Sequence, residues 1–223
     1  MKNRTFALLT ALVLLLQLAL AGWLWARWEL VVRHGTELRV PCRGYDPSDP
    51  VRGRYIRVTA ELDVPEGVGD DAFNAAVRTD TFPAVKDVYV QVNPKDPESG
   101  LTTVTALAMA PGSDGVWIGP LDVLSRWRIG WNERGKDESH DDFHQRQREG
   151  GVVYYVLLPG QYFLDERLAD GADALIRNDL PATAANSPLV GIYRARDDKL
   201  VLTALEWEGR PLETVLREKR EGR

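Results

Sequence analysis

The sequence predicts an α+β fold: a mainly antiparallel β domain with one or two short helices, preceded by one N-terminal transmembrane helix. Three observations predict it. A long run without charged residues stands near the start of the chain, apolar side chains alternate with a period of two over much of the rest, and helical spacing is confined to two later stretches. A chain of 223 residues of which 44% are hydrophobic can also bury a substantial core.

Residues 6–28 are expected to form the membrane anchor, after a basic N-terminus at residues 1–5. The run from Phe6 to Ala26 contains no charged residue. At about 1.5 Å of rise per residue it can cross a hydrocarbon core of about 30 Å. Three tryptophans at its far end are typical of the membrane interface: Trp23, Trp25 and Trp28. The sequence therefore predicts that residues 6–28 contact the lipid bilayer.

Two alternatives concern this segment. Ala19-Leu20-Ala21 resembles the cleavage site of a signal peptide, but the apolar run is longer than a usual signal core of about 7–15 residues, so we favour an uncleaved anchor. Basic residues flank the run on both sides, and counting them would keep the C-terminal part in the cytoplasm. A basic start followed at once by an apolar run is the usual export layout, and we favour an exported domain.

Beyond a juxtamembrane linker at residues 29–36, residues 37–223 are expected to form a β-rich extracytoplasmic domain. From Tyr55 onward, apolar and polar residues alternate cleanly as far as Leu62, which indicates a half-buried strand. The stretch from Val152 to Leu158 is apolar on both faces and is expected to be central. Further strands are expected at Leu38–Cys42, Val88–Val92 and Thr102–Ala110, and a hairpin is expected from Leu189–Arg194 and Leu200–Trp207.

Helices are the minority. Helical spacing of apolar residues predicts one helix over Asp165–Asn178 and a second that starts at Pro211. Residues 63–85 and 111–150 are expected to be loops, because they show neither period clearly.

Composition also limits the function. A net charge of −5 argues against a nucleic-acid partner, which would require a basic surface. The single cysteine, Cys42, cannot form an intramolecular disulfide, and its place on the apolar face of a strand predicts a buried small side chain rather than a nucleophile. No nucleophile elbow or phosphate-binding loop is present in the sequence, and no cofactor is expected.

A motif follows the first predicted strand, in the stretch from Gly44 to Val58. It contains two Asp-Pro pairs, then Arg52-Gly53 and Tyr55. This stretch resembles the GDYXXLXY family of uncharacterised bacterial membrane-anchored proteins. The matching residues are Asp46, Pro47, Asp49, Pro50, Arg52, Gly53 and Tyr55, whereas Arg54, Val58 and Ala60 stand where the family motif has Asp, Leu and Tyr.

The resemblance implies an inner-membrane or envelope protein, often encoded near multi-pass membrane proteins, with no established activity, and the export layout of the N-terminus would place its domain in the periplasm. The motif itself has two interpretations. Asp-Pro pairs favour turns, which Arg52 can hold closed, so the motif can be purely structural. Alternatively, its side chains form a docking surface for a partner: Asp46, Asp49, Arg52, Gly53 and Tyr55.

One segment resembles a metal site: His140, Asp141 and His144 lie within five residues. Histidines at i and i+4 share a face of a helix, but no helix is predicted there, and a solvated loop is expected. Tryptophans could also line a ligand groove, although core packing is the usual role of aromatics in β domains. The tryptophans concerned are Trp117, Trp127, Trp131 and Trp207.

These observations favour a non-enzymatic binding protein, an accessory subunit of a multi-pass membrane protein, held in the inner membrane by one pass. Two alternatives stay open: a membrane-tethered hydrolase or metal-dependent enzyme that uses residues 140–144, and a periplasmic ligand-binding domain.

Overall fold

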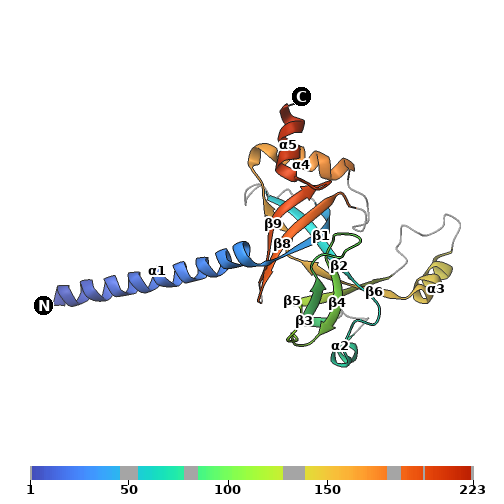
Figure 1. Cartoon of the computed structure of the whole chain (residues 1–223), viewed down its shortest axis with the longest axis horizontal. Helices are drawn as coiled ribbons and strands as arrows, with labels where there is room; N and C mark the ends of the chain where they lie inside the picture. Colours follow the sequence, from blue (N-terminus) through green and yellow to red (C-terminus); the bar gives the residue numbers. More distant parts are fainter. Residues whose placement is uncertain are drawn as a thin grey trace.

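The first element is a 33-residue helix, α1 (Lys2–His34), which projects away from the rest of the molecule (Figure 1). The computed structural model describes residues 2–45, 55–77, 85–127, 139–179, 187–197 and 199–221. Within α1, the segment Leu9–His34 contains an 18-residue window with a mean hydropathy of 2.0, none of which is buried against the protein. Among the described residues it is the one helix long and apolar enough to cross a membrane. The predicted N-terminal apolar helix is confirmed, and its length and composition fit single-pass membrane anchoring.

Strands make up most of the remaining described residues. They are β1 (Thr36–Tyr45), β2 (Tyr55–Val64), β3 (Val85–Asn93), β4 (Thr103–Ala108), β5 (Val116–Trp127), β6 (Val152–Leu158), β7 (Gln161–Phe163), β8 (Leu189–Arg196), β9 (Lys199–Trp207) and β10 (Arg210–Pro211). The helices of this part are α2 (Asp71–Ala76), α3 (His140–Gly150), α4 (Glu166–Asp179) and α5 (Leu212–Glu221).

The strands form one antiparallel sheet in the order β10-β9-β8-β1-β2-β6-β5-β3-β4, with β7 also paired to β2. This architecture confirms the predicted α+β class. β6 lies between β2 and β5, which confirms the prediction that Val152–Leu158 is a central strand. The predicted hairpin near the end of the chain is the pair β8 and β9.

β1 belongs to both halves of the sheet. Its first part, Thr36–Pro41, pairs with β8, and its second part, from Cys42 onward, pairs with β2. Beside the first part, Arg39 exchanges two hydrogen bonds of 2.8 Å with Thr102, which comes just before β4. The six strands from β1 to β4 therefore curl until the start of β4 returns to β1.

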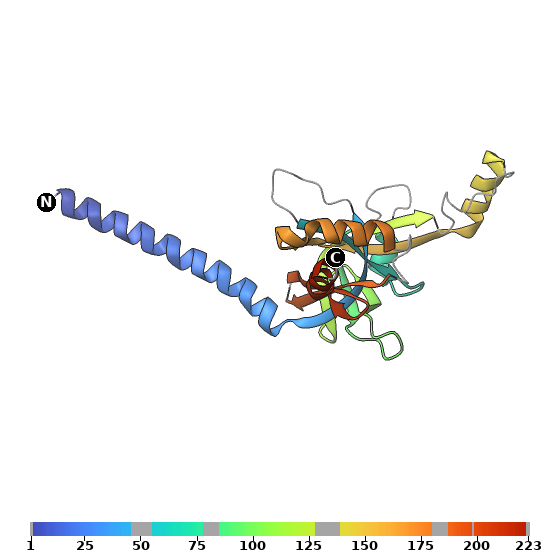
Figure 2. The ribbon, with the colours of Figure 1, turned by 90° about the horizontal axis from the view of Figure 1, so that it is seen from above.

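The inward face of this curled sheet carries the core. Val58, Ala60 and Leu62 of β2 are buried, as the alternation from Tyr55 predicts. α4 and α5 contact each other and cover one end of the sheet (Figures 1 and 2). Their buried side chains include Leu168, Ala172, Leu175, Leu212, Val215 and Leu216, which confirms the two predicted helices.

The expectation that residues 63–85 and 111–150 are loops is wrong at three places. α2 begins where the Asp70 side chain accepts a hydrogen bond of 2.6 Å from the Phe73 backbone N–H. The strand β5 spans 12 residues, and its alternation is hidden in the sequence by Gly119-Pro120 at its middle. α3 has only Phe143 and Gln147 buried, so it lacks the apolar stripe that sequence periodicity detects.

Candidate functional site

The membrane helix joins the β domain through one residue, Gly35. α1 ends at His34 and β1 begins at Thr36. The Gly35 N–H donates a hydrogen bond of 2.8 Å to the Val31 carbonyl, in the pattern of a further helical turn. A Cβ at Gly35 would lie 2.5 Å from that carbonyl oxygen, so this backbone approach requires glycine.

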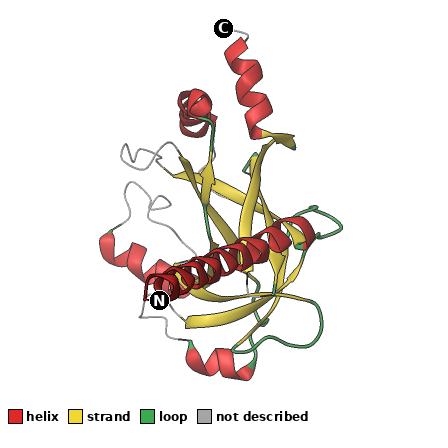
Figure 3. Ribbon diagram, turned by 90° about the vertical axis from the view of Figure 1, so that its left-hand side faces the viewer, coloured by secondary structure: helices red, strands yellow, loops and turns green. Residues whose placement is uncertain are grey.

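The last turns of α1 also pack against the domain. Val31 is only 2% exposed, and the end of α1 contacts β8 and β9. The Arg194 guanidinium donates to the Gly35 carbonyl (3.2 Å) and to the Glu37 carboxylate (2.8 Å). Residues 29–34, expected as a linker, are therefore a continuation of the helix that is docked on the domain. Figure 3, viewed from the side of α1, shows the helix running into the strands behind it.

A groove of about 750 Å³ opens beside this junction, and we call it the juxtamembrane groove. Its walls come from α1, β2, β6, β7 and β9 and are mainly apolar. The lining side chains include Trp28, Leu157, Pro159, Phe163, Leu200 and Leu202. Phe163 is 75% exposed and Leu157 is 38% exposed, so the groove presents apolar surface to its surroundings.

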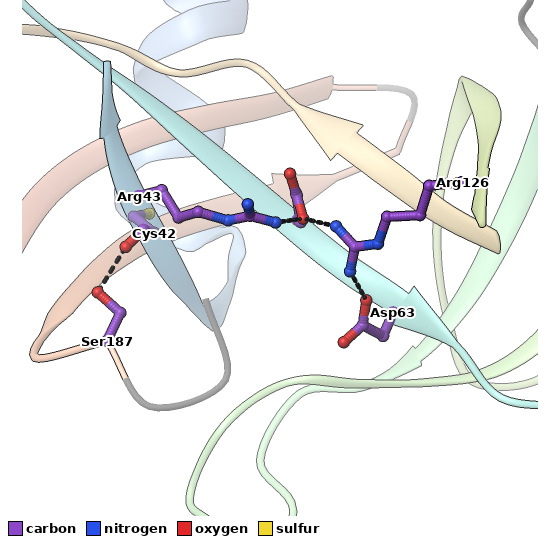
Figure 4. Close-up of polar contacts among 6 residues, drawn as sticks. Cys42, Arg43, Asp63, Arg126 and Ser187 are labelled. Atoms are coloured by element: carbon purple, nitrogen blue, oxygen red, sulfur yellow. Dashed lines mark hydrogen bonds and ion pairs between the residues drawn. The ribbon is translucent and has the colours of Figure 1, made fainter. Parts of the chain in front are cut away.

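A separate cluster of charged side chains, which we call the arginine bridge, lies on the outer face of β1, β2 and β5 (Figure 4). Glu61, only 9% exposed, accepts hydrogen bonds from both Arg43 and Arg126 on one carboxylate oxygen. Arg126 reaches Glu61 at 2.6 Å and Asp63 at 3.0 Å. The Arg126 guanidinium also lies 4.8 Å from the ring centroid of Tyr155. The bridge thus links β1 to its neighbour β2 and, across the intervening β6, links β2 to β5.

The electrostatics of the arginine bridge favour a structural role. Burial raises the pKa of Tyr155, and the Glu61 carboxylate raises it further, so this phenol stays neutral at physiological pH.

A cleft of about 680 Å³ lies next to the arginine bridge. Asp63 and Arg126 line it, together with Asn74 and Tyr154. The described residues contain no group of three or more His, Cys, Asp or Glu side chains placed to hold a metal ion.

Cys42 is fully buried, which confirms the sequence prediction. Burial raises the pKa of its thiol to about 12, so the reactive thiolate is not formed near neutral pH. Its backbone carbonyl accepts a hydrogen bond of 2.6 Å from the Ser187 hydroxyl, which attaches the segment before β8 to β1 (Figure 4).

His140 and His144 lie on α3, not in a solvated loop as expected. Their Nε2 atoms are 3.0 Å apart, the distance of an ordinary hydrogen bond between two imidazoles. Asp141 lies in the first turn of the same helix. The pair sits at the end of the domain farthest from the start of α1 (Figures 1 and 2).

The residues of the Asp-Pro motif are mostly outside the described part of the chain: Asp46, Asp49, Arg52 and Gly53. Tyr55 begins β2, where its backbone is paired with Phe163 of β7. Both interpretations of the motif, turn and docking surface, stay predictions.

The tryptophans considered for a ligand groove lie in different places. Trp207 is buried in the core, and Trp117 lines a separate cleft next to His34. Trp131 lies outside the described residues, and the side chain of Trp127 is not described.

Sequence reasoning missed Gly35, Glu61 and Phe163. Polar residues stand at every second position of β2 from Arg57 to Asp63 and give no sign that Glu61 is buried, because its partner Arg126 is 65 residues away. Phe163 carried a signal, since it follows Tyr162 in a strand: neighbouring side chains of a strand point to opposite faces, and only one of the two rings can be inside.

Comparison with known proteins gives one match. A family model described as "GDYXXLXY protein" matches residues 17–173, which include the end of α1, the junction and the strands β1 to β7. No curated protein and no solved structure matches the chain.

Proposed function

The chain belongs to the GDYXXLXY family, and from that premise we propose that it is an accessory subunit that binds a multi-pass membrane protein at the bilayer surface. In this proposal α1 crosses the inner membrane once and the β domain lies on its periplasmic side. The domain acts by binding rather than by catalysis.

The observation that carries this proposal is the one-residue junction at Gly35. A flexible linker of n residues would let a domain range over about 5–6 Å × √n from its anchor. Here the Gly35 N–H bonds to the last turn of α1, Val31 is buried against the domain, and Arg194 donates a hydrogen bond to the Gly35 carbonyl. A domain fixed in this way can contact only molecules at the membrane surface next to its own helix. Another membrane protein reaches that place by lateral diffusion in the bilayer.

The chemistry of the described side chains also supports binding. The most buried carboxylate, Glu61, is engaged by two guanidinium groups, and the thiol of Cys42 is shielded. The alternative of a metal-dependent enzyme depends on His140, Asp141 and His144, and among the described residues these do not form part of a three-ligand group.

Affinity purification of the full-length protein from detergent-solubilised native membranes, followed by mass spectrometry, tests the proposal. A multi-pass protein in stoichiometric amount is expected with the native chain. Inserting a flexible Gly/Ser segment after Gly35 is expected to abolish its recovery, because the domain is no longer held in place. The same segment inserted after Gly67, where the surroundings are open, is the matched control. Absence of a multi-pass partner across several mild detergents would contradict the proposal.

The orientation of the domain has its own test. In a Gln145→Cys variant the new thiol is exposed on α3, whereas Cys42 is buried and gives no background. A membrane-impermeant maleimide is expected to label this variant in intact spheroplasts. Labelling that requires lysis would place the domain in the cytoplasm.

A further inference from the structure

We propose that the juxtamembrane groove binds a phospholipid from the bilayer leaflet next to the domain, with an acyl chain along Phe163 and Leu157 and the phosphate beside Lys199. This inference requires α1 to cross the membrane, but it does not depend on a protein partner. The groove would make the domain a lipid-bound part of the membrane surface.

The position of the groove supports a lipid. One of its walls is Trp28, a residue of the apolar helix itself that is 49% exposed. Trp28 comes two residues after the charge-free run ends at Ala26, a rise of about 3 Å along the helix axis. Tryptophan at this level marks the boundary between hydrocarbon and headgroups. The groove therefore opens where lipid molecules already surround the helix.

The strands β6 and β7, which also line the groove, carry apolar side chains that point away from the core. On β7, the Tyr162 hydroxyl donates a hydrogen bond of 3.0 Å to Glu213 of α5, which fixes this side chain on one face. Its neighbour Phe163 must then point to the other face, where the ring is largely exposed beside Leu157. An acyl chain would remove this apolar surface from water at about 25 cal/mol per Å².

Basic side chains lie against two tryptophans of α1, one of which, Trp28, lines the groove. The Lys199 ammonium lies 5.7 Å from the centroid of the Trp28 ring, and the Arg27 guanidinium lies 4.9 Å from that of Trp23. The whole chain has a net charge of −5, so these basic side chains beside the tryptophans differ in sign from the net charge of the protein. Basic side chains at the membrane surface attract anionic lipid, and a phosphate is the group that they would meet there.

A fluorescence experiment tests this inference on the full-length chain in lipid nanodiscs. A bimane label is attached at three single positions: Phe163→Cys in the groove, Leu16→Cys in the middle of α1, and Gln145→Cys on α3. Cys42 is buried and does not compete for the label. Quenching is compared between lipids brominated on their acyl chains and iodide in the water.

With brominated lipid, the label at position 163 is expected to lose most of its emission, as the label at position 16 does, while that at position 145 keeps its emission and is quenched by iodide. If the label at position 163 instead keeps its emission with brominated lipid and is quenched by iodide, as the label at position 145 is, the groove proposal is overturned. Quenching of the label at position 16 by brominated lipid shows separately that the anchor is inserted in the membrane. A label at position 163 shielded from both quenchers would mean that protein fills the groove, and it would also overturn the proposal.

A second measurement does not depend on the label. Native mass spectrometry of the full-length protein released from the nanodiscs counts the phospholipids that stay bound. Phe163→Asp and Lys199→Glu are each expected to remove one bound lipid relative to the native chain, and Gln145→Asp to remove none. Equal lipid counts in all four proteins would contradict the inference.

Discussion

Glu61 is the only buried acidic or basic residue among the side chains that the structure describes, and both of its guanidinium partners come from other strands. Removing a charge from water costs several kcal/mol, which the attraction to nearby opposite charges offsets only when the geometry is good. In the bridge, one carboxylate oxygen of Glu61 accepts hydrogen bonds from the guanidinium groups of both Arg43 and Arg126. The main effect of the bridge is to specify the relative placement of β1, β2 and β5.

Glu61→Gln is therefore expected to lower the free energy of unfolding by about 1–3 kcal/mol, since both arginines lose a carboxylate while staying partly buried. Asp63→Asn is the control: this side chain is exposed and binds the same Arg126, and its loss is expected to cost less than about 1 kcal/mol. Urea unfolding of the full-length protein in mild detergent measures both. Equal losses in the two variants would contradict a special role for the buried carboxylate.

Cys42 gives a prediction about reactivity. With its pKa raised to about 12 by burial, the native thiol is expected to resist maleimide at pH 8 and to react once urea unfolds the chain. An exposed thiol in the Gln145→Cys variant is expected to react at once under the same conditions. Rapid labelling of the native chain at Cys42 would show that β1 and β8 open readily around this residue.

At the scale of elements, the hydrogen bond between Tyr162 and Glu213 ties β7 to α5. Burial, followed by the Glu213 carboxylate, raises the pKa of Tyr162 to about 12, above the usual value of about 10. The folded protein thus keeps a proton that the unfolded chain releases above pH 10, so stability is expected to fall as pH rises from about 10 to 12. Tyr162→Phe is expected to cost about 1 kcal/mol at neutral pH and to make this alkaline decline shallower. Unfolding curves at pH 8 and pH 11 test the sign, and an unchanged decline would contradict it.

Two glycines that flank Tyr162 in the chain have opposite expectations. At Gly160, between β6 and β7, a Cβ would lie 1.7 Å from the Val58 carbonyl oxygen, so Gly160→Ala is expected to destabilise the protein by about 1–3 kcal/mol. At Gly171 in α4, a Cβ would meet only Leu216, at an ordinary 3.6 Å. Gly171→Ala is expected to stabilise the helix by about 0.5–1 kcal/mol. Thermal unfolding of both variants checks the pair, and destabilisation by Gly171→Ala would show that α4 packs differently.

The elements also show what sequence can and cannot predict. β2 was predictable from its local alternation of apolar and polar residues, and β6 from a run of residues that is apolar on both faces. α3 was not, because its helix depends on the Ser139 cap and on two buried side chains rather than on an apolar stripe. The arginine bridge and the juxtamembrane groove were out of reach for another reason: each joins residues from strands far apart in sequence, whose register is set only by the folded sheet.

At the scale of the whole molecule, the anchor and the sheet form one continuous structure. β1 begins one residue after α1 and then pairs with strands in both halves of the sheet, so a force on the membrane helix passes directly into the core. The Asp-Pro motif, whose role stays a prediction, lies in the chain between β1 and β2. β1 and β2 belong to the sheet that is joined to α1, so the position of α1 determines where this motif lies relative to the membrane. The position of α1 likewise determines where the juxtamembrane groove lies.

The central claim is that the domain is held rigidly against its membrane helix. Electron spin resonance distance measurements between labels at Leu16→Cys and Gln145→Cys, in full-length protein in nanodiscs, test it most directly. A rigid junction is expected to give a single narrow distance distribution that broadens strongly when a flexible segment is inserted after Gly35. A broad distribution in the uninterrupted chain, unchanged by the insertion, would show that the domain moves freely on its anchor and that the junction is not rigid.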